Sequence, residues 1–172
     1  MKKIVLIYPP VTNEERYGSK LGESCGMFVP LGVFYVASYL QSKGYQVRVF
    51  DGEALNAEVD GLCRDALKCF EPGELCCIGL SATTMAFHRA LAVAEKLKEL
   101  RPDCAIILGG IHVTSNARDA LSFTAFDYGV IGEGEVTAFE LLECLYQGGD
   151  PLRVPGLAMR DALVRLGRHF VA

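Results

Sequence analysis

The sequence KIVLIYPP at residues 3–10 decides the fold class. After Lys3 come five consecutive apolar residues, and Pro9 and Pro10 stop the run. A continuous apolar run of this length, with no polar residue in alternation, is typical of a strand that is buried on both faces of a parallel sheet. The first strand therefore predicts a sheet with helices on both sides.

The rest of the chain repeats this pattern. Alternating apolar and polar residues predict a second strand over 45–50, and short apolar runs predict strands over 76–80, 104–108 and 127–131. Residues 11–29 are expected to form a long irregular loop. Helical spacing predicts helices over 31–41, 57–70, 85–100, 117–123 and 136–146, and Pro30 and Gly44 bound the first of them. Because parallel strands need crossover helices, we predict an α/β fold with a doubly wound, five-stranded parallel sheet in the flavodoxin-like order 2-1-3-4-5.

The pattern changes near residue 150. Residues 1–149 are predicted to form the α/β domain, and residues 150–172 a C-terminal extension with short strands over 154–160 and 162–165. The apolar residues of this extension have little left in the chain to pack against. We therefore expect it to lead toward a further domain that this sequence does not include.

Composition excludes several functions. The 172 residues suffice for one domain, and 51% hydrophobic residues suffice for one substantial core. A net charge of −4 argues against nucleic-acid binding.

No apolar run approaches the roughly 20 residues that cross a bilayer, and no signal-peptide cleavage pattern follows Lys2 and Lys3. No membrane contact and a cytoplasmic location are therefore expected. The seven cysteines form no Cys-x-x-Cys pair, so they are expected to be reduced core residues.

Small and polar residues follow three of the predicted strands. In such sheets, ligands bind at the carboxyl ends of the strands. The residues at these ends are Ser81, Thr83 and Thr84 after the third strand, Gly109, Gly110, Ile111 and His112 after the fourth, and Gly132, Glu133, Gly134 and Glu135 after the fifth. Glycines allow a ligand to approach the backbone closely, and short hydroxyls suit a flat or extended polar ligand. The alternatives are helix capping by the hydroxyls and by the two glutamates, and a capping or surface role for His112.

This sequence lacks the functional residues of three familiar protein classes with this architecture. A response regulator needs an aspartate after the third strand and paired acids after the first, but the sequence has Leu80 and Ser81 there, and Pro9 after Tyr8. The hydroxyl-rich phosphate loop of a flavodoxin and the GxGxxG of a Rossmann enzyme are both absent after the first strand. The GEGE segment at 132–135 is unsuitable for binding a pyrophosphate, because its two carboxylates would repel the phosphates.

Taken in order, KIVLIYPP (3–10), PLG (30–32), LSATT (80–84), GGIHVT (109–114) and GEGE (132–135) resemble the N-terminal cobalamin-binding domain of cobalamin-dependent radical S-adenosylmethionine enzymes. The resemblance covers about residues 3 to 165. It implies a cobalamin-binding, Rossmann-like domain in which Ser81 with Thr83, and Gly109 with Gly110, flank the buried nucleotide tail. The expected cobalamin contacts are Tyr8, Pro10, Val29, Pro30, Gly32, Ser81, Thr83, Thr84, Gly109, Gly110, Ile111, His112, Gly132, Glu133 and Gly134.

One departure from the wider cobalamin-binding pattern is informative. Mutases and methionine synthase carry Asp-x-His-x-x-Gly after the first strand, and the histidine ligates cobalt. If Gly32 is the matching glycine, the histidine position holds Val29 and the aspartate position holds Met27. The resemblance therefore implies a base-off cobalamin with no histidine below the cobalt, and an apolar lower face formed by Tyr8, Met27, Phe28, Val29 and Pro30.

The sequence has no Cys-x-x-x-Cys-x-x-Cys motif for a four-iron cluster. We expect no catalytic residue and no metal ligand in this chain, and no radical reaction by it alone. The resemblance implies a parent enzyme, a methyltransferase or a related enzyme, whose radical S-adenosylmethionine domain in cis or in trans adds a four-iron four-sulfur cluster and S-adenosylmethionine. The alternatives are a free-standing cobalamin carrier, a non-catalytic α/β interaction module and, less favoured, a flavin or nucleotide carrier.

Overall fold

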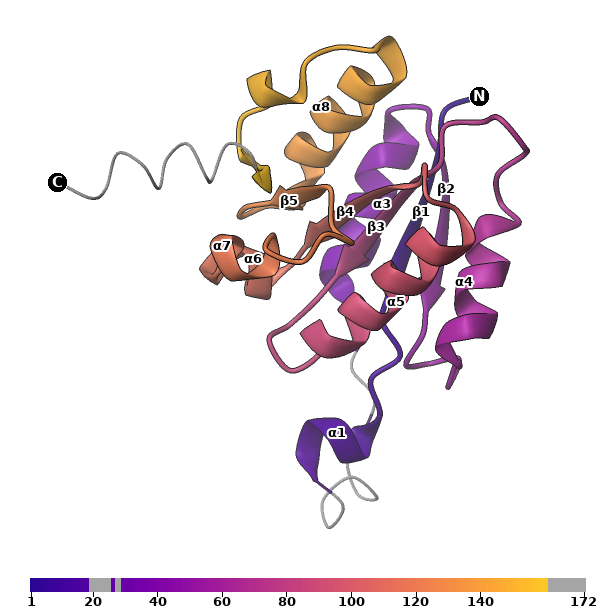
Figure 1. Cartoon of the computed structure of the whole chain (residues 1–172), viewed down its shortest axis with the longest axis vertical. Coiled ribbons are helices and arrows are strands. Elements are labelled where there is room, and N and C mark those ends of the chain that lie inside the picture. The colour runs from indigo at the N-terminus through magenta and orange to yellow at the C-terminus, as the bar shows by residue number, and fades with distance from the viewer. Residues whose placement is uncertain (19–25, 27–28, 161–172) are drawn as a thin grey trace, which may run out of the picture.

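The strands of the protein form one sheet, as seen in a computed structural model that describes residues 1–18, 26 and 29–160 (Figure 1). The strands are β1 (Lys3–Tyr8), β2 (Gln46–Asp51), β3 (Cys77–Ser81), β4 (Ala105–Gly109), β5 (Tyr128–Val130) and β6 (Leu157–Ala158). The helices are α1 (Asn13–Tyr17), α3 (Leu31–Ser42), α4 (Val59–Leu67), α5 (Phe87–Leu100), α6 (Ile111–Ser115), α7 (Ala117–Ala120) and α8 (Gly134–Gln147), and a 3-10 turn η1 spans Pro151–Arg153.

The sheet has the order β2-β1-β3-β4-β5-β6. The first five strands are parallel, and β6 is antiparallel to β5. The predicted order 2-1-3-4-5 is therefore confirmed, and the C-terminal extension contributes a sixth strand at the edge.

Two helical layers cover the sheet. In Figure 1, α4 and α5 lie in front of the strands and α3 lies behind them. The side chains of β1 alternate between the layers: Val5 and Ile7 belong to the core with α4 and α5, whereas Ile4, Leu6 and Tyr8 belong to the core with α3 and α8. Both faces of β1 are buried, which confirms the expectation from its continuous apolar run.

Several boundaries differ from the sequence-based expectation. Residues 11–29 contain the short helix α1, and GGIHVT continues into α6. The helix expected over 117–123 ends at Ala120, and the strand expected over 154–160 is reduced to Leu157–Ala158. The strand expected over 162–165 lies outside the described residues. Short helices carry weak sequence signals because a single turn presents no repeating apolar face.

Within the described part of the chain, four cysteines are buried in the core and two are partly buried. The buried cysteines are Cys63, Cys76, Cys77 and Cys104. The partly buried ones are Cys69 and Cys144. None of the helices described is long and apolar enough to span a membrane.

Candidate functional site

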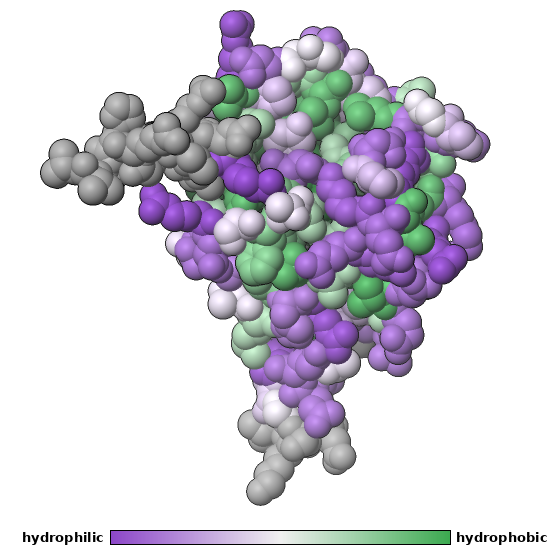
Figure 2. All heavy atoms as spheres, in the orientation of Figure 1, coloured by the Kyte–Doolittle hydropathy of each residue, from purple (hydrophilic) through white to green (hydrophobic). Residues whose placement is uncertain are grey.

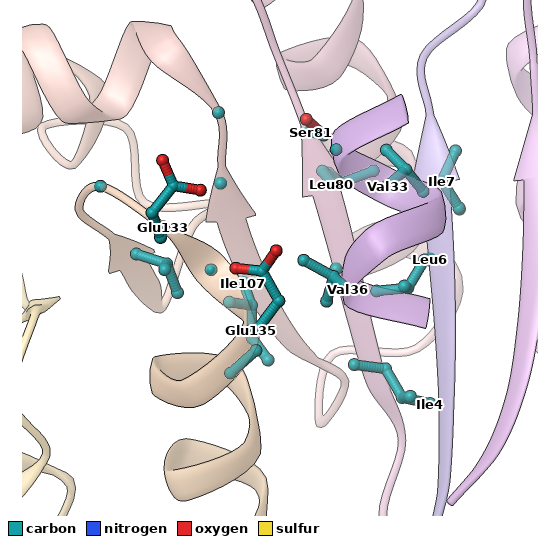
Figure 3. Close-up of a pocket in the computed structure, with 18 residues that line it drawn as sticks. Ile4, Leu6, Ile7, Val33, Val36, Leu80, Ser81, Ile107, Glu133 and Glu135 are labelled. Carbon is teal, nitrogen blue, oxygen red and sulfur yellow. The ribbon is translucent and has the colours of Figure 1, made fainter. Parts of the chain in front are cut away.

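A cavity of about 170 Å³ opens at the carboxyl ends of the strands, between α3 and α8 (Figure 3). The sheet forms its floor through Ile4 and Leu6 of β1, Gly79 of β3, Ile107 of β4 and Val130 of β5. This is the edge at which parallel α/β sheets bind ligands, and β1 and β3 mark the point where the strand order reverses.

The lining has two chemically different parts. Hydrocarbon side chains and Gly79 form the floor and the inner walls: Ile4, Leu6, Ile7, Val33, Val36, Gly79, Leu80, Ile107, Val130 and Ala138. Small or polar residues lie at the strand ends and helix starts: Gly32, Ser81, Gly109, Gly110, Gly132, Glu133, Gly134 and Glu135. The second group contains seven of the predicted contacts: Gly32, Ser81, Gly109, Gly110, Gly132, Glu133 and Gly134.

Gly110 allows the loops after β3 and β4 to touch. Its φ is +97° and its ψ is −179°, a conformation that is almost restricted to glycine. A Cβ at this position would lie 2.6 Å from the carbonyl oxygen of Ala82. The backbone N–H of Ala82 donates to the Gly109 carbonyl, and the N–H of His112 donates to the Ala82 carbonyl. These bonds fix the rim of the cavity at the ends of β3 and β4.

The GEGE segment begins α8. Glu133 is the N-cap residue of this helix and Glu135 lies in its first turn, so both carboxylates are stabilised by the helix dipole. No side-chain hydrogen bond caps α8 from Glu133, and both side chains project on the α8 side of the cavity (Figure 3). Thr114 joins this loop to the previous one, because its hydroxyl accepts from the Gly132 N–H and donates to the Gly110 carbonyl.

Thr83, Thr84 and His112 are beside the cavity and do not line it. The Thr83 hydroxyl accepts from the Ala86 N–H in the turn before α5, but the N-cap residue of α5 is Ala86 and no side chain caps the helix. The His112 ring is 6% exposed, stacks on Phe87 with 3.9 Å between ring centroids, and has Nδ1 3.3 Å from the Thr84 hydroxyl. Its Nε2 is buried and has no hydrogen-bond partner among the described residues.

The remaining predicted contacts do not line this cavity. Tyr8 is buried, and its hydroxyl accepts from Nη2 of Arg16 at 3.1 Å. Pro10 lines a second, polar pocket of about 90 Å³ with Gly52 and Glu53. Val29 and Ile111 are exposed, and Pro30 is the N-cap residue of α3. Met27 and Phe28 lie outside the described residues.

Ion pairs fasten α1 to the domain. Arg16 pairs with the buried Glu53. Burial raises the pKa of Glu15, but hydrogen bonds from Arg89, Thr12 and His88 outweigh this effect and lower it to about 2. The helix therefore fixes the chain that leaves β1.

The apolar floor is the part of the site that the sequence analysis did not identify. Its residues have the pattern of ordinary core, and no sequence signal separates them from neighbours that are fully packed. Glu135 was named in the GEGE motif but was not among the expected contacts. Its place in the first turn of α8, directly after Gly134, could have indicated it.

No histidine is among the described residues that line the cavity. Of the three histidines in the sequence, His88 is on α5, His112 is stacked on Phe87, and His169 lies outside the described residues. In the part of the chain that the structure describes, no group of three or more His, Cys, Asp and Glu side chains could hold a metal ion.

Comparison with known protein families matches residues 21–142 to the B12 binding domain. An uncharacterized methyltransferase from Pyrococcus horikoshii is 29% identical over 161 residues, which are 92% of this chain and 33% of that protein. The anaerobic magnesium-protoporphyrin IX monomethyl ester cyclase of Rubrivivax gelatinosus is 29% identical over 147 residues, 85% of this chain and 25% of that protein. The chain thus spans a third or less of these relatives.

Solved structures share the fold at low identity. The radical S-adenosylmethionine methyltransferase TsrM from Kitasatospora setae, with cobalamin and an iron–sulfur cluster bound, superposes with a TM-score of 0.74 at 18% identity, over 92% of this chain and 27% of that one. The cobalamin-dependent radical enzyme OxsB, with aqua-cobalamin bound, gives 0.71 at 15% identity, over 92% of this chain and 21% of that one.

Proposed function

The chain belongs to the B12-binding domain family, and from this premise we propose that it binds cobalamin base-off, as the N-terminal module of a radical S-adenosylmethionine enzyme. The observation that carries the proposal is the apolar cavity between α3 and α8, which opens at the strand ends.

The cavity suits one part of cobalamin. Its volume of about 170 Å³ is below the roughly 300–1,000 Å³ of sites that enclose a whole drug-sized ligand, so a corrin ring cannot enter it. The dimethylbenzimidazole of the nucleotide tail is flat, largely apolar and small enough to enter. The floor would bury this base, and the residues at the strand ends would contact the ribose and the corrin amides.

Exposed apolar side chains at the carboxyl edge offer a place for the corrin. They lie just before or within the first two turns of α3, α5, α6 and α8, and they are Val29, Leu31, Tyr35, Met85, Ile111 and Val136. Single exposed apolar residues need no explanation, but we propose that these six together form the surface that meets the corrin. By contrast, the face with α4 and α5 in front shows polar and apolar groups interspersed (Figure 2).

The base-off mode follows from burial of the base in the cavity, since a buried base cannot also ligate cobalt. With Gly32 taken as the matching glycine, Val29 holds the position of the histidine ligand in the wider family, and neither described histidine lines the cavity. When bound, cobalamin supplies a cobalt that can carry a methyl group or be reduced. The chain's own residues would bind the tail, orient the corrin and keep water from the base.

The rest of the enzyme is proposed from the relatives. We take residues 1–149 as the cobalamin-binding unit and residues 150–172 as an extension toward a radical S-adenosylmethionine domain, joined in cis or acting in trans. The methyltransferase names of relatives favour a methyltransferase as the whole enzyme. A free-standing carrier with the same cavity is the alternative.

A matched pair of glycine substitutions tests the proposal. Gly32 on α3 lines the cavity, whereas Gly61 on α4 lies on the opposite face, and an added Cβ meets no atom within 4 Å at either position. Equilibrium dialysis and visible spectra with hydroxocobalamin are expected to show saturable, base-off binding by the wild type and by Gly61→Trp. Gly32→Trp is expected to weaken binding at least tenfold, because the indole occupies the cavity or its mouth.

The outcomes separate the candidate functions. Absence of binding by the wild type at high micromolar cobalamin would reject the cobalamin-binding function for this chain and favour the interaction module. Equal weakening by both tryptophan variants would mean that the cavity is not the site.

A further inference from the structure

Among the residues that the structure describes, those in the inner part of the cavity offer no polar side chain to a buried ligand. The side chains there are aliphatic, from Ile4, Leu6, Val36, Ile107 and Val130. The backbone polar groups of the floor belong to the sheet, because Leu6 is in register with Gly79, and Gly79 with Ile107. Ser81 and the two glutamates are the side chains with polar atoms in the lining, and they come from a strand end and a helix start.

We infer that this cavity selects among cobamides by their lower base, and accepts an apolar aromatic base over a purine. The inference rests on the proposed function and adds a specificity to it. A benzimidazole or a phenol ring is mostly carbon, so it exchanges water for hydrocarbon contact at a gain. Adenine carries an amino group and several ring nitrogens, and each loses hydrogen bonds with water that the aliphatic wall cannot replace.

The two glutamates do not remove this penalty. An ionised carboxylate only accepts hydrogen bonds, so Glu133 or Glu135 could receive the adenine amino group but could not donate to the ring nitrogens. Among the described side chains of the lining, Ser81 is the one hydroxyl donor; it lies at the end of β3 and has a single O–H, so it could serve at most one of the several ring nitrogens. Negative charge near those lone pairs is repulsive. The same carboxylates suit the donors that every cobamide presents outside the cavity, which are its ribose hydroxyls and corrin amides.

Four corrinoids provide the test, with dissociation constants measured by equilibrium dialysis at neutral pH. Cobalamin has a dimethylbenzimidazole base, p-cresolylcobamide a phenolic base, adeninylcobamide a purine base, and cobinamide no base. We expect cobalamin and p-cresolylcobamide to bind at least tenfold more tightly than adeninylcobamide. The phenolic base cannot ligate cobalt, so p-cresolylcobamide controls for the cost of detaching a base before it is buried.

A variant of the cavity floor tests whether the selectivity depends on its aliphatic side chains. Val130→Thr replaces a methyl group of the floor by a hydroxyl of similar size, and is expected to narrow the ratio between cobalamin and adeninylcobamide at least threefold. Val93→Thr makes the same change in the core on the opposite face of the sheet, and is expected to leave the ratio unchanged.

The outcomes distinguish this inference from the function on which it rests. Equal affinities for cobalamin, p-cresolylcobamide and adeninylcobamide would overturn the selectivity and leave cobalamin binding intact. Equal affinity for cobinamide would show that the cavity takes no base. Failure of all four corrinoids to bind would overturn the proposed function, and the selectivity with it.

Discussion

Gly32 and Gly110 both line the cavity, but only Gly110 has a backbone that requires glycine. The extended backbone of Gly110 at positive φ is strained for any residue with a Cβ, and that Cβ would collide with the Ala82 carbonyl. Gly110→Ala is therefore expected to lower the free energy of unfolding by about 3 kcal/mol. Urea denaturation followed by circular dichroism measures this change.

Gly32→Ala is the matched control for that prediction. Gly32 is helical and an added Cβ meets no atom within 4 Å, so the substitution is expected to leave stability unchanged or to raise it by up to about 1 kcal/mol. Equal stability of the two variants would contradict the assignment of strain to Gly110. For the same reason, Gly110 is a poor position for a bulky group meant to block the cavity, because loss of binding would report misfolding.

At the scale of elements, α1 depends on the charge of Glu15. The folded pKa of about 2 is below the ordinary value of 4.5, so the stabilisation is fully present above about pH 4.5 and is lost as pH falls toward 2. Because the side chain is 26% exposed, we expect a contribution on the order of 1 kcal/mol after solvent screening. Thermal unfolding from pH 7 to pH 2 should show wild type and Glu15→Gln differing at neutral pH and converging at pH 2.

A second substitution in the same turn is the control. Glu14→Gln removes a carboxylate from α1 but leaves the contact between Glu15 and Arg89 in place. It is expected to keep the wild-type pH dependence over this range. A difference between wild type and Glu15→Gln that persists at pH 2 would mean that Glu15 acts through packing and not through charge.

The elements also show how far sequence reasoning reaches. The five parallel strands were predictable because short apolar or alternating runs are separated by stretches with helical spacing. Helix α1 was missed although its capping box, Thr12 with Glu15, is visible in the sequence, because a five-residue helix has no apolar face. In α6, the preceding glycines and the β-branched residues obscured the helix.

The candidate site also has one part that was predictable from the sequence and one part that was not. Its glycine and glutamate rim was predictable, because residues that follow strand ends must meet at one edge. The apolar floor was not, because a cavity depends on how closely α3 and α8 approach each other above the sheet. That spacing is set by contacts between distant residues, such as the approach of Gly134 to Val36, and the sequence does not specify them locally.

At the scale of the whole molecule, the cavity lies on the face of the sheet that α3 and α8 cover, and the face that α4 and α5 cover is packed core. Ligand binding slows amide exchange where it closes local openings of the native state. Cobalamin is therefore expected to slow exchange in the first turns of α3 and α8 and in the loops at 81–86, 109–115 and 131–135. The amides of α4 and the C-terminal half of α5 lie on the packed face, so their exchange is expected to stay unchanged. Hydrogen exchange with mass spectrometry, with and without hydroxocobalamin, measures both groups together, and protection centred on α4 would place the cofactor on the wrong side of the sheet for the cavity to be its site.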